Sequence, residues 1–322
     1  FEQRRGVPCQ VTFTNGLKPQ GNFVPVPPGV SPFNLRMCGG VTLQSDVGVA
    51  VHLHGARVQG YIGESGGDHD GWPLTPLGCI GNPYGFASSQ TKRYPNDQRS
   101  GMHWYHDHGM DSTAMHVHAG LAGLYFIRDE HDDALLEAVG GASQELIYVI
   151  QDRIVQPGGQ FFDYDAGVPS RGEYSRPEFL GDTLFINGHP AASKTLARRC
   201  WRLRVLNGCN SRTVALALLD ADALAARKGR IWYTDCLRVV GAEGGLLGRP
   251  VALSGTDALV ISAAQRRDIV LDLSALPAGV GRLRLVNVAL AYYLAADTQT
   301  PEAIYTNYEE SVLAPSGVNF AQ

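Results

Sequence analysis

The chain has 322 residues, a formal net charge of -4 at pH 7, 44% hydrophobic residues and 18% charged residues. This composition predicts a globular protein of about two domains and excludes an intrinsically disordered chain. The nearly balanced charge excludes a basic surface that wraps nucleic acid. No apolar run approaches the ~20 residues of a membrane-spanning helix.

Short apolar runs, rich in Val, Ile, Leu and Thr and separated by Gly, Pro, Asn and Asp, follow one another along the chain. The runs are residues 9–14, 41–43, 48–53, 121–127, 145–150, 183–186, 201–206, 258–261, 268–273 and 281–286. A helical pattern is confined to two short segments, residues 132–139 and 220–226. Many short strands separated by turn residues are typical of β-sandwiches and β-barrels, so we expect a mainly β fold.

Changes in composition along the chain predict two domains and a tail. An acidic stretch, the first short helix and Gly140-Gly141 mark a boundary, and the strand pattern fades from Ala291 onward. The expected parts are a first domain of residues 1–135, a second domain of residues 136–292 and a linker or tail of residues 293–322. The loop of residues 60–90 is too long for an ordinary hairpin, and long loops of this kind are often functional.

The cysteines do not form a recognisable metal or redox motif. The six cysteines are Cys9, Cys38, Cys79, Cys200, Cys209 and Cys236, and none lies in a CxxC segment or adjoins a histidine. We therefore expect mostly free thiols, with a disulfide or two if the protein is exported. The N-terminal residues lack the apolar core of a signal peptide, and the choice between a cytoplasmic and an exported protein stays open.

The histidines gather in one part of the chain, since eight of the ten lie between residues 52 and 118. His52 and His54 follow an apolar run, and residues two apart on a strand point to the same face. His106 and His108 form a second pair with the same spacing. Four imidazoles from two strands can converge on a metal ion, although imidazole alone does not choose among Cu, Zn, Ni and Fe.

The segments around these pairs resemble a known family. Val51-His-Leu-His-Gly55 and Trp104-Tyr-His-Asp-His108 look like the first two copper-binding motifs of multicopper oxidases. The most similar subgroup contains bacterial spore-coat laccases, bilirubin oxidases and phenoxazinone synthase. Further segments that resemble this subgroup are residues 94–99, 119–129, 185–190, 201–208, 244–247 and 263–273. The resemblance covers roughly residues 8–290.

The resemblance implies two cupredoxin-like Greek-key β-barrels or sandwiches, with a copper site in the first. By motif position, His52 would bind the type 2 copper of a trinuclear cluster. His54, His106 and His108 would bind the type 3 copper pair. In the family, this cluster reduces O2 to water with four electrons, taken one at a time from phenols, aminophenols or similar small aromatic donors.

The chain departs from the family in its C-terminal part. The third cupredoxin domain should bring an HPxHLH-like segment and a His-Cys-His segment, but after His131 the only histidine is His189. A type 1 copper takes a thiolate and two imidazoles, so this sequence does not contain that site. Either the chain is a fragment, or a second chain supplies the third domain within an oligomer. By itself the chain is expected to lack oxidase activity.

Two other functions compete with a laccase-like oxidase. The first is a non-enzymatic copper-binding or assembly protein that uses the two histidine pairs as a store. The second is a zinc hydrolase, in which three histidines and a water molecule would serve. The zinc hydrolase has little support, because no general base is placed and the surrounding motifs fit the oxidase family.

Asp70 is the expected catalytic residue. Asp70-Gly-Trp-Pro73 occupies the position of an Asp-Gly-Tyr-Pro-like turn in the subgroup, whose aspartate helps to steer protons to reduced oxygen. A carboxylate within reach of a metal-bound water suits this role. The alternative is an aspartate that only forms a turn before glycine.

The other polar residues near the motifs have open roles. Asp107 faces the opposite side of its strand from its neighbours, and it either supports a ring N–H of a ligand or is solvated. His116 and His118 form a third pair with the spacing of two and could make an extra metal site, and the role of His103 stays open. We expect Trp104 and Tyr105 to pack around the cluster. The alternation of Arg202 and Arg204 predicts a solvated structural face.

Overall fold

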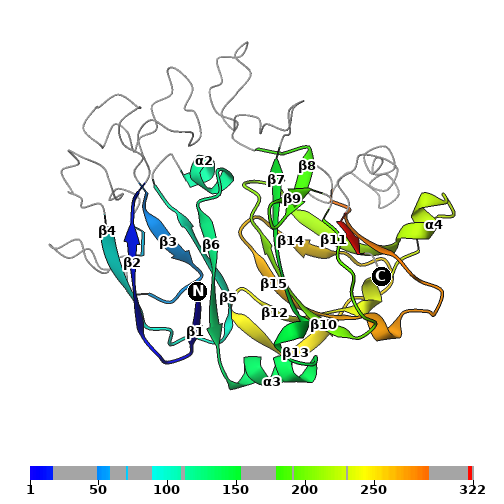
Figure 1. Ribbon diagram of the computed structural model, residues 1–322, viewed down its shortest axis with the longest axis horizontal. Helices are drawn as coiled ribbons and strands as arrows, with labels where there is room; N and C mark the ends of the chain where they lie inside the picture. Colours follow the sequence, from blue (N-terminus) through cyan, green and yellow to red (C-terminus); the bar gives the residue numbers. More distant parts are fainter. Residues whose placement is uncertain are drawn as a thin grey trace, which may run out of the picture. The chain divides into compact units, whose positions relative to one another are not determined.

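The computed structural model describes residues 1–16, 49–58, 70–71, 89–109, 113–153, 179–190, 192–229, 231–289 and 318–320. It divides into two compact units (Figure 1). The first comprises Phe1–Glu130 with Asp163–Pro177, and the second comprises His131–Phe162 with Glu178–Gln322.

The first unit contains two antiparallel or mixed sheets. Its strands are β1 (Glu2–Arg4), β2 (Cys9–Thr14), β3 (Val51–His54), β4 (Ser89–Tyr94), β5 (Gly101–Asp107) and β6 (Ala122–Arg128), and its helix is α2 (Thr113–His118). One sheet has the order β1-β6-β5-β3, and the other pairs β2 with β4. In Figure 1 these are the blue to cyan-green elements.

Alternation along β3 decides which face of the strand becomes core. Val51 and Leu53 are buried, whereas His52 and His54 are partly exposed. Leu53 packs in the core with Tyr94 from the second sheet and Tyr125 from β6. Successive side chains of a strand point to opposite faces, so burying the apolar pair directs both histidines to the other face.

The second unit also contains two sheets. Its strands are β7 (Glu145–Arg153), β8 (Thr183–Ile186), β9 (His189–Pro190), β10 (Cys200–Asn207), β11 (Val214–Asp220), β12 (Leu237–Ala242), β13 (Gly245–Ala252), β14 (Leu259–Ile261), β15 (Arg266–Asp272), β16 (Leu283–Asn287) and β17 (Val318–Phe320). The sheet orders are β13-β12-β15-β10-β7-β8-β9 and β14-β11-β16-β17. Two helices, α3 (Glu130–Ala138) and α4 (Ala221–Ala225), and three 3-10 turns, Ala142–Gln144, Thr234–Cys236 and Leu273–Ala275, complete the described elements.

The structure confirms the mainly β prediction and both expected helices. The helix α4 begins where Asp220 accepts hydrogen bonds from the backbone N–H groups of Asp222 and Ala223, as is typical of an N-cap aspartate. The helix α2 was not expected. Residues 318–320, which we expected to be part of a linker or tail, form β17 and pair with β16. The run of residues 41–43 lies outside the described residues.

The prediction of a solvated face at Arg202 and Arg204 is wrong, because both side chains have 0% exposure. Both lie on β10, on the face that carries the charged side chains rather than Leu203 and Val205. Asp132 of α3 covers this face and forms hydrogen bonds with both guanidinium groups. The alternation was recognised, but the partner lies about 70 residues away in the sequence and is invisible to local pattern.

None of the helices among the described residues is long and apolar enough to cross a membrane. The four cysteines in the described part of the chain, Cys9, Cys200, Cys209 and Cys236, are free thiols. Cys38 and Cys79 lie outside it.

Candidate metal centre

The pairing of β3 with β5 brings the histidines together. The strands are antiparallel, with His52 opposite His106 and His54 opposite Trp104. Because side chains directly opposite each other leave the same face of a sheet, His52, His54 and His106 gather on the face turned away from the core. His108 follows the end of β5, where its backbone N–H donates to Ala50 O at 2.7 Å.

Three of the four predicted ligands form a compact group. Ligand nitrogens of His52, His54 and His106 lie within 4.8 Å of one another. His54 Nδ1 and His106 Nε2 are 3.2 Å apart. The His108 ring lies beside this group, with its centroid 4.9 Å from that of His52. Sequence reasoning therefore located the residues that the structure brings together.

Two backbone carbonyl groups orient the rings. His52 Nδ1 donates to Asp70 O at 2.9 Å, and His106 Nδ1 donates to Asp107 O at 2.7 Å. A carbonyl oxygen only accepts, so the hydrogen lies on Nδ1 in each ring and Nε2 is left as the possible metal ligand. Such partners fix both the tautomer and the ring orientation of metal-binding histidines.

Trp104 packs against two of these rings. Its ring centroid is 5.4 Å from that of His54 and 4.2 Å from that of His106. The indole side chain is only 4% exposed. The expectation that Trp104 packs around the site is confirmed. The same expectation for Tyr105 is wrong, because Tyr105 packs against the core cluster on the opposite face.

Asp70 lies at the open edge of β3, next to His52. Its Oδ1 accepts a hydrogen bond from the Leu53 backbone N–H at 2.7 Å, and its Oδ2 is 2.9 Å from His52 Nδ1. Gly71 has φ +73°, and a Cβ there would lie 2.6 Å from Val51 O. Only glycine allows this turn to approach the strand so closely, so Asp70-Gly71 acts both as a turn and as a contact to His52.

Burial and charge set the protonation of the rings. Burial, together with the nearby His52 and His108, lowers the pKa of His106 to about 4. Burial also lowers the pKa of His108. For His52, burial lowers the pKa, but the hydrogen bonds and the negative charge of Asp70 outweigh it and raise the pKa above its usual value. Neutral imidazole is the form that binds metal, so His106 is ready for a metal ion even in mildly acidic solution.

The low pKa of His106 predicts a loss of stability in acid. In the metal-free protein, His106 is neutral in both the folded and the unfolded chain above ~6.5, the pKa of an unfolded histidine. Its burial therefore does not lower the free energy of unfolding through protonation at these pH values. As the pH falls from there towards about 4, the unfolded chain takes up a proton that the folded chain refuses, and the free energy of unfolding should fall. Urea unfolding between pH 7 and pH 4 in a chelator measures this. The His106→Gln variant should lose less stability over the same range; an identical pH dependence in both proteins would contradict the assignment.

Asp107 supports the site from the other face of β5. Its carboxylate, which is 1% exposed, accepts hydrogen bonds from the Ala50 backbone N–H at 2.7 Å and from His116 Nδ1 at 2.8 Å. The solvated alternative for Asp107 is therefore wrong. Its carboxylate binds His116, and its backbone carbonyl rather than its carboxylate supports the ring of His106.

The remaining histidines do not join the three-histidine group. His116 and His118 lie on α2, where residues two apart do not share a face, unlike on a strand. His103 lies two residues before Tyr105 on β5, so both side chains point to the same face, opposite to that of His106. Gln98 Nε2 is 3.3 Å from His103 Nε2. Among the described residues, the only group of three or more potential ligands is His52, His54 and His106. His69, the histidine directly before Asp70 in the sequence, lies outside the described residues.

Lys92 was missed by sequence reasoning although it lies close to the site. It is buried on β4, and its Nζ donates to Val51 O at 2.5 Å. The signal that could have found it is its spacing of two from Tyr94, which belongs to the core. Residues two apart on a strand share a face, so Lys92 had to point inward with Tyr94.

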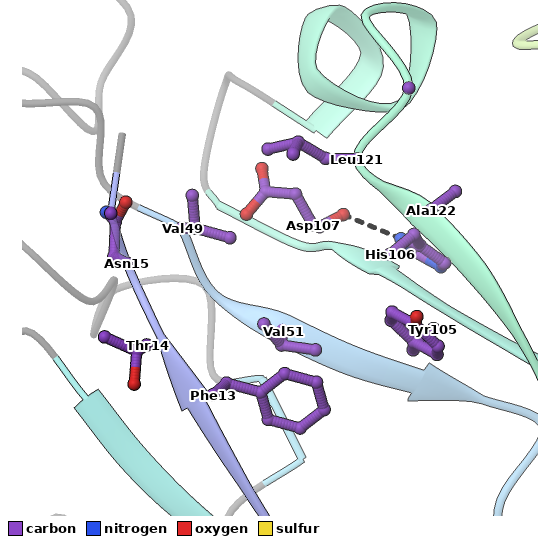
Figure 2. A pocket seen from close by; sticks show the side chains of 12 residues that line it. Phe13, Thr14, Asn15, Val49, Val51, Tyr105, His106, Asp107, Leu121 and Ala122 are labelled. Atoms are coloured by element: carbon purple, nitrogen blue, oxygen red, sulfur yellow. Dashed lines mark hydrogen bonds between the residues drawn. The ribbon is translucent and has the colours of Figure 1, made fainter. Parts of the chain in front are cut away.

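A cavity of about 440 Å³ adjoins the back of the same strands. Figure 2 shows Val51, Tyr105 and Leu121 along its wall, together with the hydrogen bond between Asp107 and His106. The lining side chains are mostly apolar. His106 and Asp107 line it as well, so the cavity shares these two residues with the candidate metal centre and its support.

Comparison with known proteins identifies relatives over most of the chain. No family model matches. Multicopper oxidase LPR1 homolog 5 from Oryza sativa subsp. japonica is 31% identical over 287 residues, which are 89% of this chain and 39% of the relative. The laccase of Bacillus subtilis (strain 168) is 28% identical over 282 residues, 85% of this chain and 48% of the relative. The bilirubin oxidase of Albifimbria verrucaria is 31% identical over 227 residues, 70% of this chain and 34% of the relative.

A solved structure shows the same fold. The McoA multicopper oxidase of Aquifex aeolicus matches with a TM-score of 0.64 and 24% identity, over 89% of this chain and 49% of that one. This likeness confirms the predicted cupredoxin-type fold class. The chain spans about half the length, or less, of the curated relatives that it matches.

Proposed function

Because the chain belongs to the multicopper oxidase family, we propose that it supplies the first two cupredoxin domains of a laccase-like oxidase. The complete protein would oxidise phenols, aminophenols or similar one-electron donors and reduce O2 to water. A third cupredoxin domain, from another chain or from a further segment, would complete it. The relatives are about twice the length of this chain, which supports a missing domain.

The observation that carries the proposal is the convergence of His52, His54 and His106 on one face of β3 and β5. Imidazole nitrogen is a good donor for copper, and three rings at this spacing suit one or more shared cations. Burial lowers the pKa of the fourth histidine, His108, which favours the neutral ring that binds a metal ion. The donor set therefore fits copper.

We assign His52 to the type 2 copper and His54, His106 and His108 to the type 3 pair, as their motif positions imply. When bound, copper supplies the single-electron chemistry for O2 reduction. The chain's own residues hold the rings in place, since carbonyl groups of Asp70 and Asp107 set the tautomers of His52 and His106. A type 1 copper would lie in the third domain.

We assign Asp70 the role of the residue that delivers protons. Its Oδ2 lies 2.9 Å from His52 Nδ1, and the carboxylate is only partly buried. A carboxylate beside a metal ligand can hold a proton at Oδ2 and release it towards the site. The contact with the Leu53 backbone N–H keeps the carboxylate at this edge of the strand.

The experiment that tests the proposed function starts from the protein isolated from its own source. Denaturing mass spectrometry asks whether this sequence lies in a longer polypeptide or beside a second chain with a His-Cys-His segment. Copper is then quantified, and O2 uptake is recorded with 2,6-dimethoxyphenol as the donor. We expect a third domain, bound copper and O2 uptake that stops when copper is removed. Copper binding without any O2 uptake by the complete protein would instead favour a copper-storage or assembly protein.

A further inference from the structure

A buried lysine lies beside the candidate metal centre without a role in the proposed function. Lys92 is 2% exposed and is among the largest fully buried side chains. Lysine is almost never fully buried unless its charge is paired, because removing an ammonium group from water costs much free energy. Its neighbour Arg93 points the other way and is exposed, so the burial of Lys92 is specific to its side of β4.

Lys92 binds the open edge of β3. In an antiparallel pair, every second residue turns its backbone groups away from the partner strand. Ala50 pairs with β5 through its carbonyl, so Val51 and Leu53 direct their backbone groups to the opposite edge. Lys92 Nζ donates to Val51 O there, at 2.5 Å.

Asp70 binds the same edge two residues further along. Its Oδ1 accepts from the Leu53 backbone N–H at 2.7 Å. The ammonium group and the carboxylate thus bind the peptide groups on the two sides of His52. Burial lowers the pKa of Lys92 to about 8, and the negative charge of Asp70 opposes this shift. The two opposite charges thus lie on adjacent peptide groups of one strand edge, where they attract each other.

We propose that Lys92 is a positioning residue of this site: its ammonium group fixes the edge of β3 and balances the charge of Asp70. Asp70 then keeps the hydrogen of His52 on Nδ1 and leaves Nε2 for the metal ion. The part of this inference that concerns copper rests on the proposed function. The part that concerns the His52 tautomer does not.

The test measures the tautomer of His52 in the metal-free chain. Long-range ¹H–¹⁵N spectra of ¹⁵N-histidine-labelled protein distinguish Nδ1–H from Nε2–H rings, and a His52→Gln sample assigns the signal. We expect the Nδ1–H form in the unchanged chain and a mixture of forms in Lys92→Met. Lys92→Arg, which keeps the charge, should preserve the Nδ1–H form. Arg93→Met, which removes an exposed charge from the same strand, should also preserve it.

Copper binding gives the second measurement. Loss of a partner behind a metal ligand typically lowers metal affinity 10–100-fold, so titration with Cu²⁺ should show a loss of about 10-fold or more in Lys92→Met. The Arg93→Met variant should bind as the unchanged chain does. If Lys92→Met does not fold, Lys92→Gln keeps a neutral donor for Val51 O and should still shift the tautomer.

The two proposals fail in different ways. A folded Lys92→Met or Lys92→Gln chain with the unchanged His52 tautomer and copper affinity overturns the role of Lys92. An unchanged chain that binds no Cu²⁺ overturns the proposed copper site, while the tautomer measurement still decides whether Lys92 positions His52.

Discussion

Replacing His106 with Ala is expected to abolish copper binding at the candidate centre and, with it, O2 reduction by the complete protein. The ring of His106 lies close to both other members of the three-histidine group. Its Nε2 is 3.2 Å from His54 Nδ1, and its ring centroid is 5.3 Å from that of His52. The loss should exceed the 10–100-fold typical of a residue that only supports a ligand.

The measurement is copper retained after dialysis, followed by O2 uptake with a phenolic donor. His189→Ala is a matched control, because His189 is exposed and lies on β9 in the second unit. This control should retain copper and activity. Undiminished O2 uptake in a folded His106→Ala protein would exclude His106 as a ligand and would leave the family relationship without a working site in this chain.

Much of the candidate site could be predicted because its signal is local. The alternation Val51-His-Leu-His54 identifies both the core face and the ligand face of one strand. The same spacing recurs at His106, on β5, and His108, directly after the end of that strand. Only the antiparallel register, which sets His52 opposite His106, requires the folded structure.

The rest of the site depends on contacts that no sequence window contains. Asp107 was expected either to support a ring N–H of a ligand or to be solvated, and only the structure shows that its backbone carbonyl accepts from His106 Nδ1. Lys92 reaches Val51 across 41 positions of the chain. The pairing of His116 with Asp107 depends on α2, a six-residue helix whose sequence carries no clear helical pattern.

The prediction of a solvated face at Arg202 and Arg204 was wrong for the same reason, because their partner Asp132 is distant in the sequence. Alternating arginines on a strand are usually solvated, and only the position of α3 over β10 reveals that they are buried. Asp132 Oδ1 accepts hydrogen bonds from Arg202 Nη2 at 2.7 Å and from Arg204 Nη2 at 2.5 Å. All three side chains have 0% exposure.

Replacing Asp132 with Ala should destabilise the second unit by about 3–5 kcal/mol, because it leaves two buried guanidinium groups without their shared carboxylate. Asp268 still binds Arg202, and Glu145 Oε1 still lies 2.7 Å from Arg204 Nε, so the unit should fold but unfold at a lower denaturant concentration. Urea unfolding at pH 7 measures the difference in free energy.

Asp133→Ala is the matched control for this experiment, since Asp133 is the exposed neighbour of Asp132 on α3. It should change the free energy of unfolding by no more than ~0.5 kcal/mol. The loss in Asp132→Ala should also persist in 1 M NaCl, because buried pairs are screened much less than exposed ones. A loss below 1 kcal/mol, or one that disappears in salt, would contradict the buried network. The charges of Arg202 and Arg204 would then face water, as their alternation alone had suggested.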